Sequence, residues 1–278
     1  MTFDLRASES LLRVSVFVLV FVAMAAWELW APKRPQLTPR SGRWPSNLGI
    51  VVLNTLLVRA LFPLTAVAWA DWLHQRDGGA LHGLPVPPWL AVVLALVLLD
   101  LVIYLQHRLF HAVPLFWRLH RMHHADTEFD VTNGLRFHPL EILLSMLIKF
   151  AAIAAIGAPP LAVLVFEIVL NATSIFNHAN VRMAAGFDRV LRWFVVTPDM
   201  HRVHHSVVPR ETNSNFGFNL PWWDRWFGTY RAQPQAGHAD MRIGLGQFRD
   251  RRWLRIDRML RQPWASEADD LPARPPDP

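Results

Sequence analysis

The chain has 278 residues and a formal net charge of +6, with 52% apolar residues, only 18% charged residues and no cysteine. This composition argues against an ordinary soluble globular protein. The absence of cysteine excludes a disulfide scaffold, thiolate zinc sites, iron–sulfur clusters and cysteine nucleophiles.

The first two apolar regions, residues 11–30 and 49–73, are long enough to cross a membrane, which takes about 20 largely apolar residues. Ala-Met-Ala at 23–25 resembles a signal-peptidase site, so a cleaved leader is the alternative to a first membrane span. The second region contains Arg59 and Pro63, and we expect an interruption of its helix there.

The third and fourth apolar regions cover residues 89–105 and 142–176. Gly-Ala-Pro-Pro at 157–160 breaks the fourth region into two halves that are each slightly short for a full span. This pattern predicts a helical hairpin that enters and leaves on the same face. Asp100 and Lys149 are charges at membrane depth, where such residues normally face the interior of a helix bundle.

The distribution of charge predicts the orientation. The positive-inside rule places the loop after the first region in the cytoplasm, because it carries four basic residues, Lys33, Arg34, Arg40 and Arg43. The number of spans then brings the histidines of 107–124 and 201–205 to the same face. All but two of the 28 basic residues are arginine, a bias that suggests a bacterial genome. We expect a bacterial inner-membrane protein whose basic residues meet anionic lipid rather than nucleic acid.

The chain is therefore predicted to be an all-α integral membrane bundle with about three spans plus a helical hairpin. Residues 1–88 are the expected membrane anchor, and residues 89–232 the expected catalytic domain. Within 233–278 we expect a basic amphipathic helix over 240–262, on the membrane surface or packed on the domain, and a disordered Pro-rich tail.

Histidine is the unusual residue of this chain, because ten of its thirteen histidines lie between residues 107 and 205. Eight of them form one H-x-x-x-H and two H-x-x-H-H patterns: His107, His111, His120, His123, His124, His201, His204 and His205. On a helix, residues at i, i+3 and i+4 share one face, so each cluster presents two or three imidazoles to a single point.

Eight clustered imidazoles predict two metal ions, because one metal ion seldom takes more than four protein donors and neutral imidazole is the commonest ligand. The sequence has no H-E-x-x-H motif of a zinc protease and no run of carboxylates of the ferritin kind. An all-nitrogen pair of sites at a membrane face suggests iron and dioxygen chemistry, although the ligand count alone does not identify iron.

The pattern resembles the fatty acid hydroxylase/sterol desaturase superfamily. The resemblance covers residues 90–232 and rests on the three histidine motifs with Arg-Phe-His-Pro-Leu-Glu at 136–141, Asn-His-Ala-Asn at 177–180, Thr-Pro-Asp-Met at 197–200 and Asn-Phe-Gly-Phe-Asn at 215–219, followed by Trp-Asp-Arg-Trp-Phe-Gly-Thr-Tyr at 223–230. It implies a cytosolic histidine cap that holds two irons over a helical bundle, and the hydroxylation or desaturation of a lipid C–H bond with dioxygen.

The resemblance also implies roles for single residues. It makes the eight clustered histidines iron ligands and adds His178, while His138 is either a ligand or a residue that supports one. Some relatives have a further histidine where this chain has Ser174. Candidates for orienting a ligand imidazole are Asp100, Glu141, Asn180 and Asp199.

Electrons are expected to come from NAD(P)H through a separate redox partner, because the H-P-G-G haem motif of some relatives is missing from this sequence. The expected substrate is a lipid: an acyl chain, a sphingoid base, a sterol, an ether lipid or a carotenoid. Two other classes of protein stay open at this point, a membrane metal transporter and a membrane haem protein.

Overall fold

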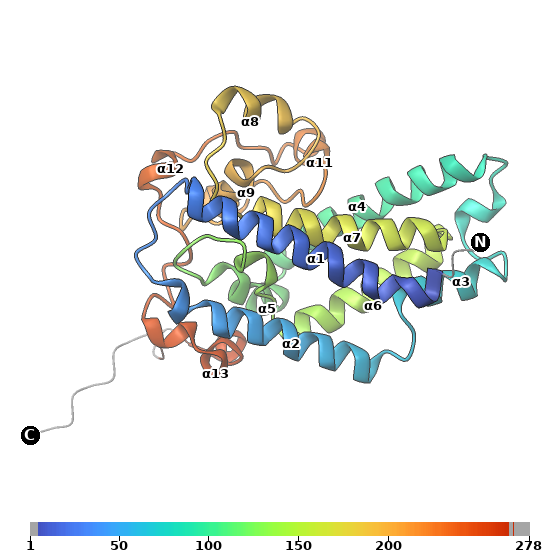
Figure 1. The fold of residues 1–278 in the computed structure, drawn as a ribbon, viewed down its shortest axis with the longest axis horizontal. Helices are drawn as coiled ribbons and strands as arrows, with labels where there is room; N and C mark the ends of the chain where they lie inside the picture. Colours follow the sequence, from blue (N-terminus) through green and yellow to red (C-terminus); the bar gives the residue numbers. More distant parts are fainter. Residues whose placement is uncertain (1–4, 267–268, 270–278) are drawn as a thin grey trace, which may run out of the picture.

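The computed structural model describes residues 5–266 and 269. These residues are helical apart from connecting loops and two isolated β-bridges. Long helices run side by side, and most of the short helices gather in a cap at one end of the bundle (Figure 1). This arrangement confirms the predicted all-α bundle.

Five segments are long and apolar enough to cross a membrane, as expected for three spans and a hairpin. They are built from α1 (Leu5–Trp30), α2 (Trp44–Leu61) with α3 (Ala66–His74), α4 (Pro88–Ala112), α6 (Pro139–Ile156) and α7 (Pro160–Asn177).

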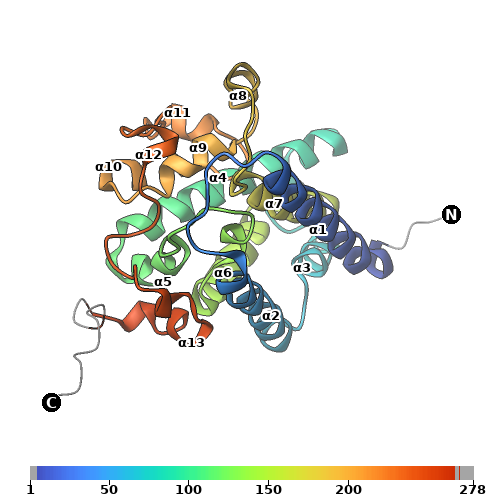
Figure 2. The same cartoon turned by 60° about the vertical axis from the view of Figure 1, so that its left-hand side comes forward.

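The cap contains the remaining helices. They are α5 (Pro114–His124), α8 (Ala185–Leu191), α9 (Pro198–His204), α10 (Pro209–Thr212), α11 (Trp222–Trp226), α12 (Gly237–Asp240) and α13 (Ile256–Met259). In Figure 2 α8 and α13 lie on opposite sides of the cap.

Both interruptions of the apolar regions occur where the sequence predicts them. The second region breaks at Pro63, and Thr65 then caps α3 by accepting a hydrogen bond from the backbone of Ala68. The hairpin between α6 and α7 turns at Gly157, whose φ of 70° is left-handed. A Cβ on Gly79 would lie 2.2 Å from the nitrogen of Gly157, so the hairpin turn packs closely against the loop that precedes α4.

Charges inside the bundle are paired with one another. Glu167 of α7 accepts hydrogen bonds from Lys149 of α6 at 2.6 Å and makes an ion pair with Arg13 of α1 at 2.9 Å. Such pairing is the usual solution for ionised groups at membrane depth. The ion pair between Arg13 and Glu167 ties α1 to the hairpin.

Helix α4 is longer than a membrane span. Its 25 residues extend about 37 Å at 1.5 Å per residue, against about 30 Å of hydrocarbon. Its last turns therefore project into the cap, and they carry His107 and His111.

An exposed aromatic surface lies beside α4 at the edge of the cap. Phe194 of the segment after α8 is 64% exposed and Trp226 of α11 is 69% exposed. Helix α11 is held against α4 by Trp223, whose indole N–H donates to Asp100 at 2.7 Å. Aromatic side chains in this position are typical of the membrane–water interface.

The C-terminal arm, residues 237–266, differs from the single helix expected over 240–262. Gly244 and Phe248 both have positive φ, which ends a helix there. Phe248 and Trp253 pack on Ala125, whereas Met259 packs elsewhere in the cap. The apolar residues thus fill separate parts of the core instead of forming one helical stripe. The tail predicted to be disordered lies outside the described residues, apart from Ser266 and Asp269.

Candidate metal centre

The cap brings nine histidines together in two adjoining groups, and the donor atoms within each group lie within 4.8 Å of one another. We call the first the five-histidine group; its members come from α4, α5 and α9 and are His107, His111, His120, His124 and His204. The second is the four-histidine group, which consists of His123, His178, His201 and His205.

Each H-x-x-H-H motif contributes to both groups. In α5, His124 belongs to the five-histidine group and the adjacent His123 to the four-histidine group. At the end of α9, His204 and His205 divide in the same way. The rings of His124 and His205 stack with their centroids 4.5 Å apart. Neighbouring residues on a helix point in different directions, so one histidine of each adjacent pair enters each group. The two groups adjoin because these pairs link them.

Hydrogen bonds orient most of the five-histidine group. The Nδ1–H groups of His107 and His204 donate to the backbone carbonyls of Phe216 and Ser214, both at 2.8 Å. The Nδ1–H of His120 donates to Glu141 at 2.6 Å. A proton held on Nδ1 leaves the Nε2 lone pair free, and this fixes the tautomer that a metal ligand needs.

The four-histidine group is oriented mainly by packing. Its one Nδ1 hydrogen bond joins His178 to the carbonyl of Ser174 at 2.7 Å. Phe137 stacks on His123 with ring centroids 4.4 Å apart. In the described part of the chain, Nδ1 of His123 and Nδ1 of His201 have no hydrogen-bond partner.

The electrostatics of the cap keep these imidazoles neutral. Burial, reinforced by the neighbouring imidazoles, lowers the pKa of His123, His124, His204 and His205 well below the usual value. Burial also lowers the pKa of His178, to about 3. Neutral imidazoles can act as metal donors at neutral pH.

The donor atoms fit bound cations. Nε2 of His178 lies 3.2 Å from Nε2 of His123 and 3.0 Å from Nε2 of His201. Because His178 holds its proton on Nδ1, its Nε2 presents a lone pair to these neighbours. The buried Nε2 atoms of His107 and His204 have no partner among the described residues. Buried lone pairs that have no partner or that face one another are costly without a ligand, and a metal ion between them would satisfy them.

The candidate supporting residues have different surroundings. Glu141 contacts a clustered histidine, as described above. Asp100 accepts hydrogen bonds from Trp223 and Leu220, so its contacts lie in the segment around α11. Asn180 bonds to the backbone of Arg34, and Asp199 makes ion pairs with Lys33 and Arg202. None of these contacts involves a histidine of either group.

His138 lies apart from both groups. It precedes α6, where its Nδ1 accepts a hydrogen bond from the backbone of Leu140 and its Nε2 lies 3.2 Å from the carbonyl of Leu260. Both ring nitrogens are therefore engaged in capping α6 and holding the C-terminal arm. Ser174 also points away from the groups, because its hydroxyl donates to the carbonyl of Gly134 at 2.7 Å.

A buried ion network supports the segment after α5, which sequence reasoning did not predict. Arg43 is fully buried and makes two hydrogen bonds to Asp126 and one to Asp130. Arg136 donates to the carbonyl of Met122 at 2.8 Å. Since Met122 precedes His123 and His124, the network fixes the backbone that carries them. The one available signal was the unusual arginine and aspartate content of 126–136 and 40–43.

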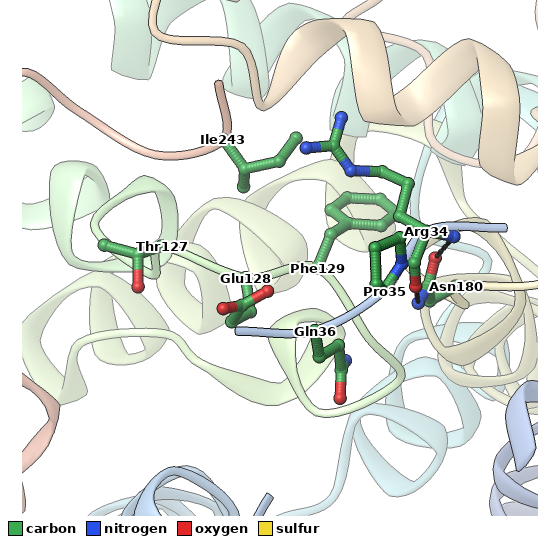
Figure 3. Close-up of a pocket in the computed structure, with 8 residues that line it drawn as sticks. All are labelled: Arg34, Pro35, Gln36, Thr127, Glu128, Phe129, Asn180 and Ile243. Carbon is green, nitrogen blue, oxygen red and sulfur yellow. Dashed lines mark hydrogen bonds between the residues drawn. The ribbon is translucent and has the colours of Figure 1, made fainter. Parts of the chain in front are cut away.

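A small pocket lies next to the four-histidine group (Figure 3). Its volume is about 10 Å³, and Arg34, Glu128 and Phe129 are among the residues that line it. The ring of Phe129 separates the pocket from the group, since it also packs on His178 and His205. A space of this size holds about one water molecule.

Comparison with known proteins adds a family match. Residues 92–229 match the sequence model of a family described as fatty acid hydroxylase. This stretch contains all nine histidines of the two groups.

Three curated relatives illustrate the similarity. Ornithine lipid hydroxylase OlsE of Rhizobium tropici is 35% identical over 152 residues, which cover 55% of this chain and 45% of that protein. Alkylglycerol monooxygenase of Xenopus tropicalis is 32% identical over 132 residues, which cover 47% of this chain and 28% of that protein. Cholesterol 25-hydroxylase of Rattus norvegicus is 26% identical over 231 residues, which cover 79% of this chain and 74% of that protein. The chain thus spans less than half the length of the first two, and no solved structure gives a significant match.

Proposed function

The chain belongs to the fatty acid hydroxylase family through residues 92–229 and is an integral membrane protein, and from this premise we propose that it hydroxylates a C–H bond of a membrane lipid with dioxygen and two iron ions. The observation that carries the proposal is the pair of adjoining histidine groups with their donor atoms turned inward. The ligands we propose are the nine histidines of the two groups.

Bound iron would supply the site that activates dioxygen for reaction with a C–H bond. The protein's part is to hold and shield that site. Glu141 and the carbonyls of Phe216 and Ser214 fix the imidazole tautomers. His201, His204 and the other buried imidazoles are at most a few per cent exposed, which keeps bulk water away from the reacting atoms.

The membrane bundle makes a lipid the fitting substrate. Five apolar segments end at the cap, so a lipid reaches the histidine groups from the bilayer without crossing water. Relatives named as hydroxylases of ornithine lipids, alkylglycerols and cholesterol act on lipids of different structure. We therefore propose lipid as the substrate class, and hydroxylation ahead of desaturation because the names of these relatives denote hydroxylases and monooxygenases.

The geometry disfavours the two other classes of protein. A transporter would place its ligands near the middle of the bilayer, whereas both histidine groups lie in the cap. A haem protein would use isolated histidines on facing helices, whereas these histidines share groups of four and five.

We further propose that the cap faces the cytoplasm, following the four basic residues of the loop between α1 and α2. This orientation gives a cytoplasmic electron-transfer protein, supplied by NAD(P)H, access to the cap.

The test is lipid analysis of a bacterial host that expresses the chain under ¹⁸O₂. The expected product is a host lipid with one added oxygen-18 atom, which a His204→Ala variant fails to make. A lipid that loses two hydrogens and gains no label would replace hydroxylation by desaturation. Full turnover by the variant would contradict the proposed site. An optical spectrum and metal analysis of the purified chain separate iron from haem.

A further inference from the structure

The C-terminal arm forms an open basin outside the metal centre. The basin has a volume of about 450 Å³. Its lining includes three arginines and two tryptophans: Arg252, Arg258, Arg261, Trp253 and Trp264. Among the described residues, Asp269 is the one carboxylate that lines it, so the described lining is basic.

Contacts hold this basin at the level where the helices leave the membrane. Ile256 of α13 packs on Gly49, in the second turn of α2; a Cβ on that glycine would lie 3.2 Å from the Ile256 side chain. Trp264 packs edge-on against His138, directly before α6, with ring centroids 5.7 Å apart. Both α2 and α6 begin a candidate span at this level. The basin therefore opens beside the surface of the bilayer on the cap side.

The lining offers hydrogen-bond donors that have no acceptor in the described chain. Trp253 is 3% exposed, and its indole N–H has no hydrogen-bond partner. Arg258 lies 3.7 Å from Asp257 and also faces the charge of Asp269, while Arg261 makes no ion pair with any described residue. A buried N–H without an acceptor is costly. An oxyanion in the basin would satisfy it and pair with the guanidinium groups.

We propose that the basin binds the phosphate of an anionic phospholipid in the leaflet next to the cap. Guanidinium groups suit phosphate because their N–H groups match its oxygens. Trp264 at the edge of the basin is 66% exposed, and tryptophan in such a position favours the headgroup region. The location at the bilayer surface is the reason to choose a lipid over free phosphate. The proposal does not depend on the reaction that the metal centre performs.

The experiment compares lipids on the full chain purified in a neutral detergent. The chain is offered an equal mixture of phosphatidylglycerol and phosphatidylcholine with the same acyl chains, and native mass spectrometry measures which lipid stays bound. We expect a preference for phosphatidylglycerol. An arginine near an anionic surface contributes about 1 kcal/mol, so Arg261→Gln should lower the preference about fivefold and R258Q/R261Q about 25-fold.

One further variant serves as a control and another tests the indole N–H. Arg210→Gln removes an exposed arginine of α10 that does not line the basin, and should leave the preference unchanged. Trp253→Phe keeps a ring in the core while it removes the indole N–H, and should lower the preference a few fold. Metal content, measured on every variant, shows that the cap has folded.

Three results would overturn the proposal. One is equal binding of the two lipids by the unaltered chain. Another is a preference that survives in R258Q/R261Q when metal content is normal. The third concerns the source of the phosphate: if millimolar inorganic phosphate raises the thermal unfolding temperature as much as phosphatidylglycerol does, the site binds free phosphate and not a lipid.

Discussion

The five-histidine and four-histidine groups share two motifs and adjoin one another, yet they are held in different ways. In the first group, four Nδ1 atoms have a hydrogen-bond partner outside the group; the fourth is that of His111, which lies 3.2 Å from Asn213. In the second group only His178 has such a partner among the described residues. Ring packing by Phe137 on His123 and by Phe129 on His205 takes the place of those bonds.

The difference indicates two degrees of preorganisation. Hydrogen bonds to the outer nitrogen fix both the orientation of an imidazole and the position of its proton, whereas stacking on a ring restricts only the orientation. We infer that the five-histidine group is built to receive its metal, and that the four-histidine group is ordered more by the metal itself. Variants that act on one group at a time test this.

The largest effect should follow the loss of a ligand. His204 and His205 are adjacent in sequence but belong to different groups, so His204→Ala and His205→Ala form a matched pair. Each should abolish lipid hydroxylation and remove one of two bound metal ions per chain, because each deletes a donor from one site only. Mass spectrometry of metals in the purified chain measures this. Two metals retained by either variant would contradict the division into groups.

A smaller effect is expected when the acceptor for a ligand is changed. Glu141→Gln removes the negative charge that accepts the Nδ1–H of His120. Mutation of such a partner typically costs 10–100-fold in metal affinity or activity. The affinity should fall for one metal ion per chain, in a competition titration with a chelator, while the other ion serves as an internal control. An equal fall for both would show that the groups are not independent.

Several of these features could be predicted from the sequence because they are local. The length of an apolar region predicts a span, and Pro63 and Gly157 predict the breaks. Histidines at i, i+3 and i+4 predict a shared face. The division between His123 and His124 is different, because it depends on which histidines each of them meets in three dimensions. His124 meets histidines of α4 and α9, whereas His123 meets His178 after α7.

The acceptors that bind the Nδ1–H groups of the histidines could not be predicted from the sequence, for another reason. Phe216 and Ser214 act through backbone carbonyls, which every residue has, so no residue type marks them. Asp100 has the correct spacing on α4 to face a ligand, yet the indole of Trp223, 123 residues away in sequence, is its partner. His138 likewise resembles a ligand in sequence and caps a helix in the structure.

Gly134→Ala should perturb the four-histidine group through the backbone. A Cβ at this position would lie 2.4 Å from the carbonyl oxygen of Ser174, the acceptor for His178. The last turn of α7 must therefore shift. Overpacking of this kind costs about 1–3 kcal/mol, and we expect a lower unfolding temperature together with weaker binding of one metal ion. Gly186→Ala is the control, because its added Cβ meets open space. Normal metal binding by Gly134→Ala would show that the Ser174 carbonyl does not position His178.

The smallest effect should come from the packing itself. Phe137→Leu keeps an apolar side chain but removes the ring that stacks on His123. Aromatic stacking contributes about 0.5–1.5 kcal/mol, which corresponds to a factor of roughly 2–12 in an equilibrium constant at 1.4 kcal/mol per tenfold change. We expect a chelator to extract one metal ion faster from this variant. The ring also stacks on His120 of the five-histidine group, but with the centroids 6.3 Å apart, so the second ion should be affected less. The matched control is Phe216→Leu. Its ring packs on His107 and His204, but its carbonyl, which the substitution retains, holds His107. If hydrogen bonds rather than packing order the five-histidine group, this variant should release its metal at nearly the normal rate. Equal acceleration in both variants would remove the distinction between the groups, because ring packing would then order the imidazoles of each.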